Sequence, residues 1–174
     1  MKIAAIQLNV GEFKEKNITK AVHFVKEAIE RGSKAIFLPE VFNYRGPLNK
    51  GILSEISEKI PGPSLEPFLA LAKKHRVFIV AGSIYEKIPK HAKCYNTSVV
   101  INDYGRVSAR YRKINLFDAV VVDRVIKEPQ NFSAGKAAVI APLGPMRLGM
   151  TVCYDLRFPE LFRKYGKKKC EIIA

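Results

Sequence analysis

The sequence predicts an α/β fold in which helices cover a mixed β-sheet. Strand-like apolar runs alternate with segments of helical periodicity in the first half of the chain, and the second half changes to a series of strand-like segments. A further helical segment returns just before the last strand-like run. No internal repeat, linker or second-domain boundary interrupts this order, so we expect one domain spanning residues 1–174.

The first half of the chain supplies strands and helices in alternation. Lys2–Gln7 alternates and is rich in small and β-branched residues, which predicts a strand. Ile18–Arg31 carries an apolar stripe at helical spacing that ends before Gly32, and Ser64–His75 has the same spacing. Between these helices, the apolar run Ala35–Leu38 predicts a strand buried on both faces, followed by a loop that contains glycine and proline.

The second half is dominated by strand-like segments. The turn residues Asn102–Gly105 predict a hairpin, Asn115–Lys136 reads as a long irregular stretch, and Pro159–Tyr165 reads as a helix. The predicted strands are Val77–Ala81, Ser98–Ile101, Val107–Tyr111, Val139–Ile140, Arg147–Thr151 and Glu171–Ile173.

The charge balance alone does not identify a partner. Thirty Lys and Arg against sixteen Asp and Glu give a net charge of +14, which can attract nucleic acid, anionic membranes or acidic small molecules. The positive charges are scattered, however, and no aromatic ladder accompanies them, so we expect no specific nucleic-acid partner. No apolar run approaches the length of a membrane span, and we expect no membrane association.

Cysteine usage and the first residues favour a cytoplasmic protein. The three cysteines include no CxxC pair, which indicates neither a disulfide framework nor a zinc site. The start of the chain does not read as a signal peptide, which also favours the cytoplasm.

Other common sites are not indicated by the sequence. The histidines lack metal-ligand spacing, so we expect no metal. The chain also contains neither the GxGxxG nor the GxSxG motif.

Three polar residues follow strand-like runs and form a candidate site. Glu40 follows Ile36–Pro39, Lys113 ends the basic run that closes a predicted strand, and Cys153 follows Leu148–Val152. Ligand sites in α/β sheets gather beyond the carboxyl ends of strands. An ammonium can stabilise a thiolate and later an oxyanion, and a carboxylate can carry protons, so the trio is suited to nucleophilic catalysis. Taken singly, a cysteine at a strand end is usually a small buried hydrophobic residue, and a lysine or glutamate in a loop is usually solvated.

The segments FLPE (Phe37–Glu40), YRKINLFD (Tyr111–Asp118) and GMTVCYDLRFPELFR (Gly149–Arg163) resemble, in order, the three signature blocks of the nitrilase superfamily. CYDLRFPE resembles the amidase branch that includes ω-amidases and the Nit proteins. The resemblance runs from end to end of the chain. It implies an α-β-β-α sandwich with a mixed sheet and flanking helices, a homodimer or larger assembly, and neither a metal nor an organic cofactor.

The resemblance also implies roles for individual residues. Glu40 would be the general base, Lys113 the oxyanion-stabilising cation and Cys153 the nucleophile, with Glu128 as a second glutamate near them. The backbone N–H of Tyr154 would help hold the oxyanion. The implied reaction is hydrolysis of a small linear amide with release of ammonia, and nitrile hydrolysis is the less favoured variant.

Arg157 is the candidate for substrate recognition. It lies four residues after Cys153, where some family members that read a carboxylate carry an arginine. A guanidinium grips a carboxylate bidentately, which favours an ω-amide of a dicarboxylic acid. The alternative is that Arg157 only braces its loop by pairing with Asp155 or Glu160.

Chains of this family continue beyond the strand that here ends at Glu171–Ala174, so the resemblance predicts that the C-terminal part of the domain is missing. This leaves a second hypothesis, a catalytically silent truncated or split subunit that acts by associating with a partner. Unpaired strand edges favour such association.

Overall fold

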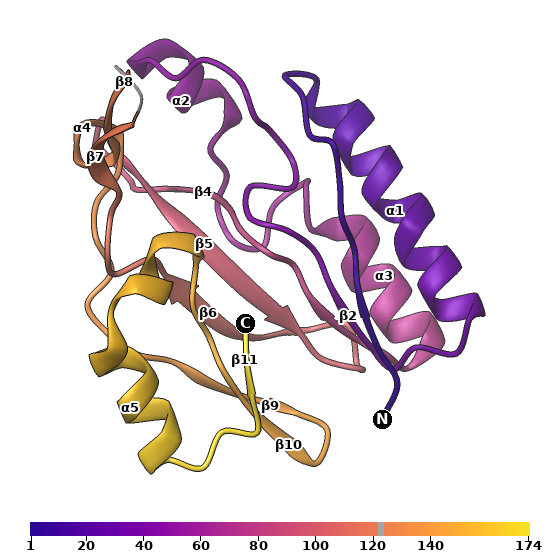
Figure 1. Cartoon of the computed structure of the whole chain (residues 1–174). Coiled ribbons are helices and arrows are strands. Elements are labelled where there is room, and N and C mark those ends of the chain that lie inside the picture. Colours follow the sequence, from indigo (N-terminus) through magenta and orange to yellow (C-terminus); the bar gives the residue numbers. More distant parts are fainter. Residues whose placement is uncertain (122–123) are drawn as a thin grey trace.

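The computed structural model describes residues 1–121 and 124–174, and it shows two β-sheets stacked between two helical layers. In Figure 1 the helices α1 (Lys14–Glu30) and α3 (Glu66–His75) lie side by side along one flank, and α5 (Pro159–Lys167) lies at the opposite flank. The predicted α-β-β-α arrangement is therefore confirmed.

The larger sheet has the strand order β1-β2-β3-β5-β4, with β6 paired to the other side of β5. β1, β2 and β3 are parallel to one another, whereas β5 is antiparallel to β3, β4 and β6, so the sheet is mixed as predicted. Its strands are β1 (Ile3–Ala5), β2 (Ala35–Phe37), β3 (Phe78–Val80), β4 (Ile84–Lys87), β5 (Cys94–Ile101) and β6 (Val107–Arg112).

The smaller sheet has the order β11-β10-β9, with β10 parallel to β11 and antiparallel to β9. Its strands are β9 (Ile140–Leu143), β10 (Met146–Gly149) and β11 (Ile172–Ile173). Gly149 lies beneath the ring of Tyr165 in α5, where an added Cβ would come within 2.6 Å of that ring. This absence of a side chain lets α5 lie close against β10.

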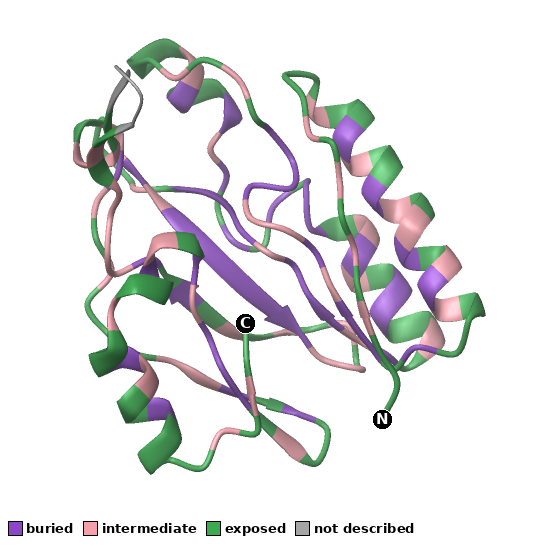
Figure 2. Ribbon diagram, in the orientation of Figure 1, coloured by how far each residue is buried: buried purple, intermediate pink, exposed green. Residues whose placement is uncertain are grey.

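The core consists of two apolar layers on the two faces of the larger sheet. Side chains of α1 and α3 pack against Ile36, Ile79 and Val99 on one face. Val80 and Val100 point to the other face, where they meet the smaller sheet and α5. β5 is buried along nearly its whole length, as its continuous purple ribbon in Figure 2 shows. Burial of apolar surface in these layers is the main force that fixes the strand ends.

Five elements were absent from the sequence-based prediction. The loop predicted after residue 38 contains α2 (Lys50–Ile56), and β4 follows β3 directly. The stretch predicted to be irregular, 115–136, contains the paired strands β7 (Asp118–Val121) and β8 (Arg124–Lys127) and the short helix α4 (Glu128–Asn131). Residues 122 and 123 of that stretch lie outside the described residues.

Candidate active site

Glu40 lies just beyond the carboxyl end of β2, in a backbone packed against the end of β3. The N–H of Leu38 donates to the carbonyl of Val80 over 2.9 Å, and an added Cβ on Gly82 would fall 1.8 Å from the carbonyl oxygen of Pro39. Only glycine permits this approach, which holds the Glu40 turn against the sheet. The Glu40 Oε1 accepts a hydrogen bond of 2.8 Å from the amide nitrogen of Asn96 in β5.

Lys113 follows the last residue of β6 and is almost completely buried, with 1% of its side chain exposed. Its N–H donates to the carbonyl of Asn96 over 2.9 Å, and its own carbonyl accepts from Gly135 over 2.8 Å. The Nζ lies 2.9 and 3.0 Å from the two carboxylate oxygens of Glu128 and 3.5 Å from Oε1 of Glu40. The ammonium therefore sits between two carboxylates, as a buried charge requires.

Glu128 is fixed by its position at the start of α4. Its Oε2 accepts from the N–H of Phe117 over 2.7 Å, and its own N–H donates to the Phe117 carbonyl over 2.9 Å. The structure thus places Glu128 beside Lys113, where the resemblance expected a second glutamate.

Cys153 begins the 3-10 helix Cys153–Arg157 directly after the β10 segment and has a positive φ of 49°. Non-glycine residues rarely adopt this left-handed region, and such strain clusters at functional sites. The side chain is exposed, and the thiol is free. The first N–H groups of a helix lack partners within the helix, so the N–H of Tyr154 is suited to bind an anion.

The buried carboxylate of Asp155 links the turn at Cys153 to the segment around Lys113. Its Oδ2 accepts from the hydroxyl of Tyr111 at 2.7 Å and from the N–H of Val152 at 3.0 Å. Its Oδ1 accepts from the backbone and side-chain nitrogens of Asn115 at 2.9 and 2.8 Å. Asp155 therefore holds the residue before Cys153 and the residues on either side of Lys113 in fixed positions relative to one another.

Tyr154 and Arg157 both follow Cys153 closely in sequence, but Tyr154 packs against neighbouring rings, whereas Arg157 lies outside the cavity at Cys153. The Tyr154 ring stands edge-on to Phe117 at 4.8 Å and to Phe158 at 5.4 Å, which links the Cys153 turn to the segment that holds Glu128. Arg157 is exposed and does not line the cavity at Cys153. In the described part of the chain, its guanidinium makes no salt bridge with either Asp155 or Glu160, so the bracing alternative gains no support.

Lys113 acts to stabilise the Cys153 thiolate, as expected, but burial and Glu40 outweigh its effect on the thiol pKa. Burial, and then the charge of Glu40, raise the pKa of the Cys153 thiol above its ordinary value, and the Lys113 ammonium opposes this only in part. Burial also acts to lower the pKa of Lys113, but Glu40 and Glu128 outweigh it and the pKa is raised. The resting site therefore holds a neutral thiol, a carboxylate able to take its proton and a firmly charged ammonium.

A cavity of about 210 Å³ opens at Glu40 and Cys153. This volume is below the range of about 300–1,000 Å³ usual for drug-sized ligands, which indicates a small substrate. Within residues 1–121 and 124–174, no three His, Cys, Asp or Glu side chains gather as metal ligands would. Besides Glu40 and Cys153, the cavity is lined by Phe37, Leu38, Val80, Gly82, Ser98, Thr151, Val152 and Ala174.

Two site residues were missed by the sequence reasoning. Asn96 holds both the Glu40 carboxylate and the Lys113 backbone, and Arg45 places Nη2 3.7 Å from Oε2 of Glu40. Nothing in the local sequence marks Asn96, because its role depends on the register of β5 against β6. Arg45 lies in the loop after Glu40, and its proximity in sequence was the available signal.

The sequence and the fold are similar to those of proteins already characterised. The sequence profile of the carbon-nitrogen hydrolases matches residues 2–174. Nitrilase homolog 2 of Dictyostelium discoideum is 37% identical over 167 residues, covering 95% of this chain and 50% of that protein. Omega-amidase NIT2 of Danio rerio is 37% identical over 174 residues, covering 99% of this chain and 61% of that protein.

Among solved structures, Saccharomyces cerevisiae Nit3, a member of branch 10 of the nitrilase superfamily, superposes with a TM-score of 0.84. It is 29% identical, and the match covers 99% of this chain and 62% of Nit3. The chain thus spans about half to three fifths of the length of these proteins. None of the helices in the described part of the chain combines the length and apolar character needed to cross a bilayer.

Proposed function

The chain belongs to the carbon-nitrogen hydrolase family, and on that premise we propose that it cleaves the C–N bond of a linear amide through a thioester on Cys153. The observation that carries this proposal is the meeting of Glu40, Lys113 and Cys153 at one place from three separate strand ends. Relatives named as omega-amidases favour an amide over a nitrile, and they favour an enzyme over a silent subunit.

The proposed reaction begins with attack of the Cys153 sulfur on the amide carbonyl carbon, while the thiol proton passes to Glu40. The negative charge on the carbonyl oxygen is stabilised by the Lys113 ammonium and the N–H of Tyr154. Glu40 then delivers the proton to the amide nitrogen, the C–N bond breaks and ammonia leaves. The acyl group remains on Cys153 as a thioester.

Hydrolysis of the thioester reuses the same groups. Glu40 takes a proton from water, and the resulting hydroxide adds to the thioester carbon. The second oxyanion occupies the place of the first and collapses, which breaks the C–S bond and releases the carboxylic acid. The departing thiolate recovers the proton from Glu40, in keeping with a thiol whose resting pKa is raised. Glu128, bonded to Lys113, keeps the ammonium in position throughout.

The protein would act in a compartment that keeps thiols reduced. A catalytic thiol must not be oxidised, and all three cysteines are free. We therefore propose a cytoplasmic enzyme, and we propose that it assembles as a homodimer or larger, as the family resemblance implies.

Ammonia release from defined amides tests the activity and the substrate class together. We expect turnover of succinamate, an ω-amide that carries a carboxylate, to exceed that of the neutral propionamide, because the exposed Arg157 guanidinium is available to a carboxylate. A mass increase of one acyl group on the intact protein should accompany turnover. No ammonia and no adduct with any amide would contradict the proposed function itself.

The substrate class is tested separately with Arg157→Gln. This change should raise KM for succinamate by about tenfold and leave KM for propionamide unchanged, because a charge-assisted bond is lost only with the acidic substrate. Arg45→Gln is the matched comparison, since Arg45 is a second exposed guanidinium near Glu40. If KM for succinamate rose in Arg45→Gln but not in Arg157→Gln, Arg45 rather than Arg157 would bind the substrate carboxylate.

The role of Glu40 is tested by thiol alkylation. Glu40→Gln removes the charge that raises the pKa of Cys153 but keeps Lys113, which lowers it. We therefore expect iodoacetamide to alkylate Cys153 faster at pH 7, by roughly threefold for each unit by which the pKa falls, because the thiolate fraction rises while the nucleophilicity of the thiolate declines. Ammonia release should be lost in the same variant.

The exposed Glu160 supplies a control for Glu40→Gln, and Glu160→Gln should change neither rate. Alkylation that stays constant or slows in Glu40→Gln would show that the carboxylate does not govern the thiol.

A further inference from the structure

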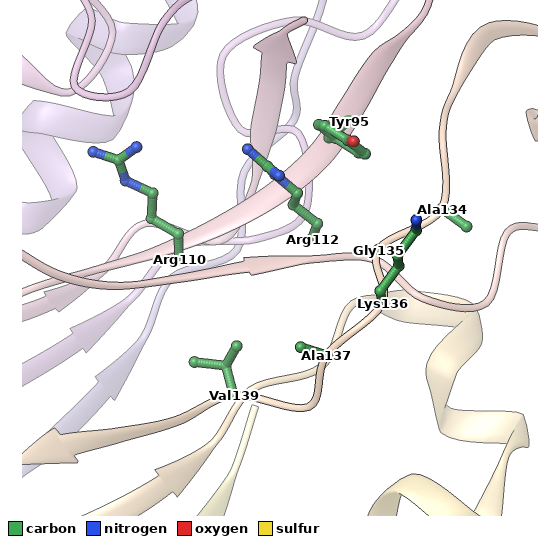
Figure 3. A pocket seen from close by; sticks show the side chains of 8 residues that line it. All are labelled: Tyr95, Arg110, Arg112, Ala134, Gly135, Lys136, Ala137 and Val139. Carbon is green, nitrogen blue, oxygen red and sulfur yellow. The ribbon is translucent and has the colours of Figure 1, made fainter.

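A second cavity, of about 460 Å³, lies between β6 and the segment 134–139. It shares no lining residue with the cavity at Cys153. In Figure 3, Arg110 and Arg112 extend from the same strand, with Tyr95 beyond Arg112 and the segment that carries Lys136 across from them. Because residues two apart in a strand share a face, the two guanidinium groups are brought to one side of β6.

Arg112 is held rigidly in this cavity and its charge is neutralised. Its Nε and Nη2 donate to the two carboxylate oxygens of the buried Glu86 over 2.8 and 2.7 Å, and its guanidinium stacks 4.1 Å over the ring of Tyr95. Glu86 also accepts from the hydroxyl of Thr97 over 2.8 Å. Its hydrogen-bonding capacity is thus largely used by Arg112 and Thr97.

Arg110 and Lys136 carry the charge that remains in the cavity. Neither takes part in a salt bridge within residues 1–121 and 124–174. Three cationic side chains and one carboxylate leave a local charge of +2. A concave site with two uncompensated positive charges attracts small anions.

The opposite wall of the cavity is apolar and firmly placed. Ala134, Ala137 and Val139 line it. The segment is bound to the sheet through Gly135, whose N–H donates to the Lys113 carbonyl and whose added Cβ would meet the carbonyl oxygen of Arg112 at 2.1 Å. The wall offers a surface for the uncharged part of a ligand, and its fixed geometry lowers the entropic cost of binding.

We propose that this cavity is a binding site for a small organic dianion, distinct from the amide-hydrolysing site. The anionic group, a phosphate or a pair of carboxylates, would lie at the preformed Arg112–Tyr95 stack, with Arg110 on one side of Arg112 and Lys136 on the other supplying the uncompensated positive charge. Its organic body would lie against Ala137 and Val139. The volume lies within the usual range of about 300–1,000 Å³ for small-molecule sites, and a bare inorganic ion would leave most of it empty.

Calorimetric titration of the chain tests this proposal. Phenyl phosphate and phthalate are the dianionic probes, and phenol is the uncharged comparison. We expect a dianion to bind with one-to-one stoichiometry, and we expect phenol to bind at least tenfold more weakly. The tighter of the two dianions distinguishes phosphate from carboxylate recognition. Failure of both dianions to bind more tightly than phenol would overturn the proposal.

The double variant Arg110→Gln/Lys136→Gln assigns the binding to this cavity. It should weaken binding of the dianion by about tenfold or more, because two charge-assisted contacts are removed. Arg112 is left intact because its ion pair with Glu86 belongs to the fold. Lys26→Gln/Lys74→Gln is the matched control, since it removes two exposed charges from α1 and α3 and should change affinity by less than about twofold.

Equal loss of affinity in both double variants would mean that the dianion responds only to the overall charge, and the site would be rejected. Unchanged affinity in Arg110→Gln/Lys136→Gln would reject it as well. Ammonia release by that variant separates the two proposals, because neither substituted residue lines the cavity at Cys153.

Discussion

Replacing Cys153 by alanine should reduce amide hydrolysis to the background rate, a loss on the order of 10⁶-fold where the nucleophile of a hydrolase is removed. Cys153 is the exposed cysteine that shares a cavity with Glu40, and its thiol is the strongest nucleophile among the side chains that line that cavity. Stability should change little, since the side chain is exposed and alanine avoids a new polar group. Ammonia release and thermal unfolding of the same preparation measure the two effects.

The other cysteines provide the controls for this prediction. Burial raises the pKa of Cys94 to about 12, so its thiol stays protonated and unreactive at neutral pH. Cys170 lies between α5 and β11 and packs against the smaller sheet. Cys94→Ala and Cys170→Ala should each keep amidase activity, although Cys94→Ala should lose some stability. Residual turnover in Cys153→Ala at the level of these controls would exclude the thioester mechanism.

The positions of the proposed catalytic residues were predictable because they depend on strand ends. Glu40 and Cys153 each follow an apolar run that the sequence marks clearly, and a sheet brings such ends together. The parallel arrangement of β1, β2 and β3 likewise follows from strands separated by helices. The fold class could therefore be predicted from the hydrophobic periodicity of the longer segments alone.

The elements that were missed have weak local signals. α2 has only seven residues and carries Gly51 at its second position, which lowers helix propensity. The side chain of Asn49 does cap it, accepting from the N–H of Ile52 over 3.0 Å, and this was a readable signal. β4 contains the buried charge of Glu86, which is compatible with a strand only because Arg112 pairs with it across the sheet.

The electrostatics of the site could not be obtained from the sequence at all. The presence of a lysine suggested a stabilised thiolate, but the direction of the shift depends on which charge lies nearer to the sulfur and how deeply the thiol is buried. In the structure Glu128 and Glu40 share the Lys113 ammonium, which limits its effect on Cys153. The pKa of the thiol is consequently raised.

Lys113→Met should lower kcat by about 10²–10³-fold, the usual effect of losing one oxyanion donor. It should also lower the free energy of unfolding by about 3–5 kcal/mol at pH 7, because a buried ion pair loses one partner. Glu40 and Glu128, with 22% and 18% of their side chains exposed, would then lose the ammonium that lies between them. The exposed Lys26 offers a control, and Lys26→Met should change neither quantity appreciably.

The pH dependence of stability separates this ion-pair role from a simple packing role. In the unmodified chain the folded pKa of Lys113 is raised, so its contribution to stability is complete below its ordinary value of 10.5 and is lost as the pH rises through the folded pKa. In Lys113→Met that alkaline loss should shrink. If the free energy of unfolding of Lys113→Met differed from that of the unmodified chain by the same amount at every pH, Lys113 would contribute to stability only through packing.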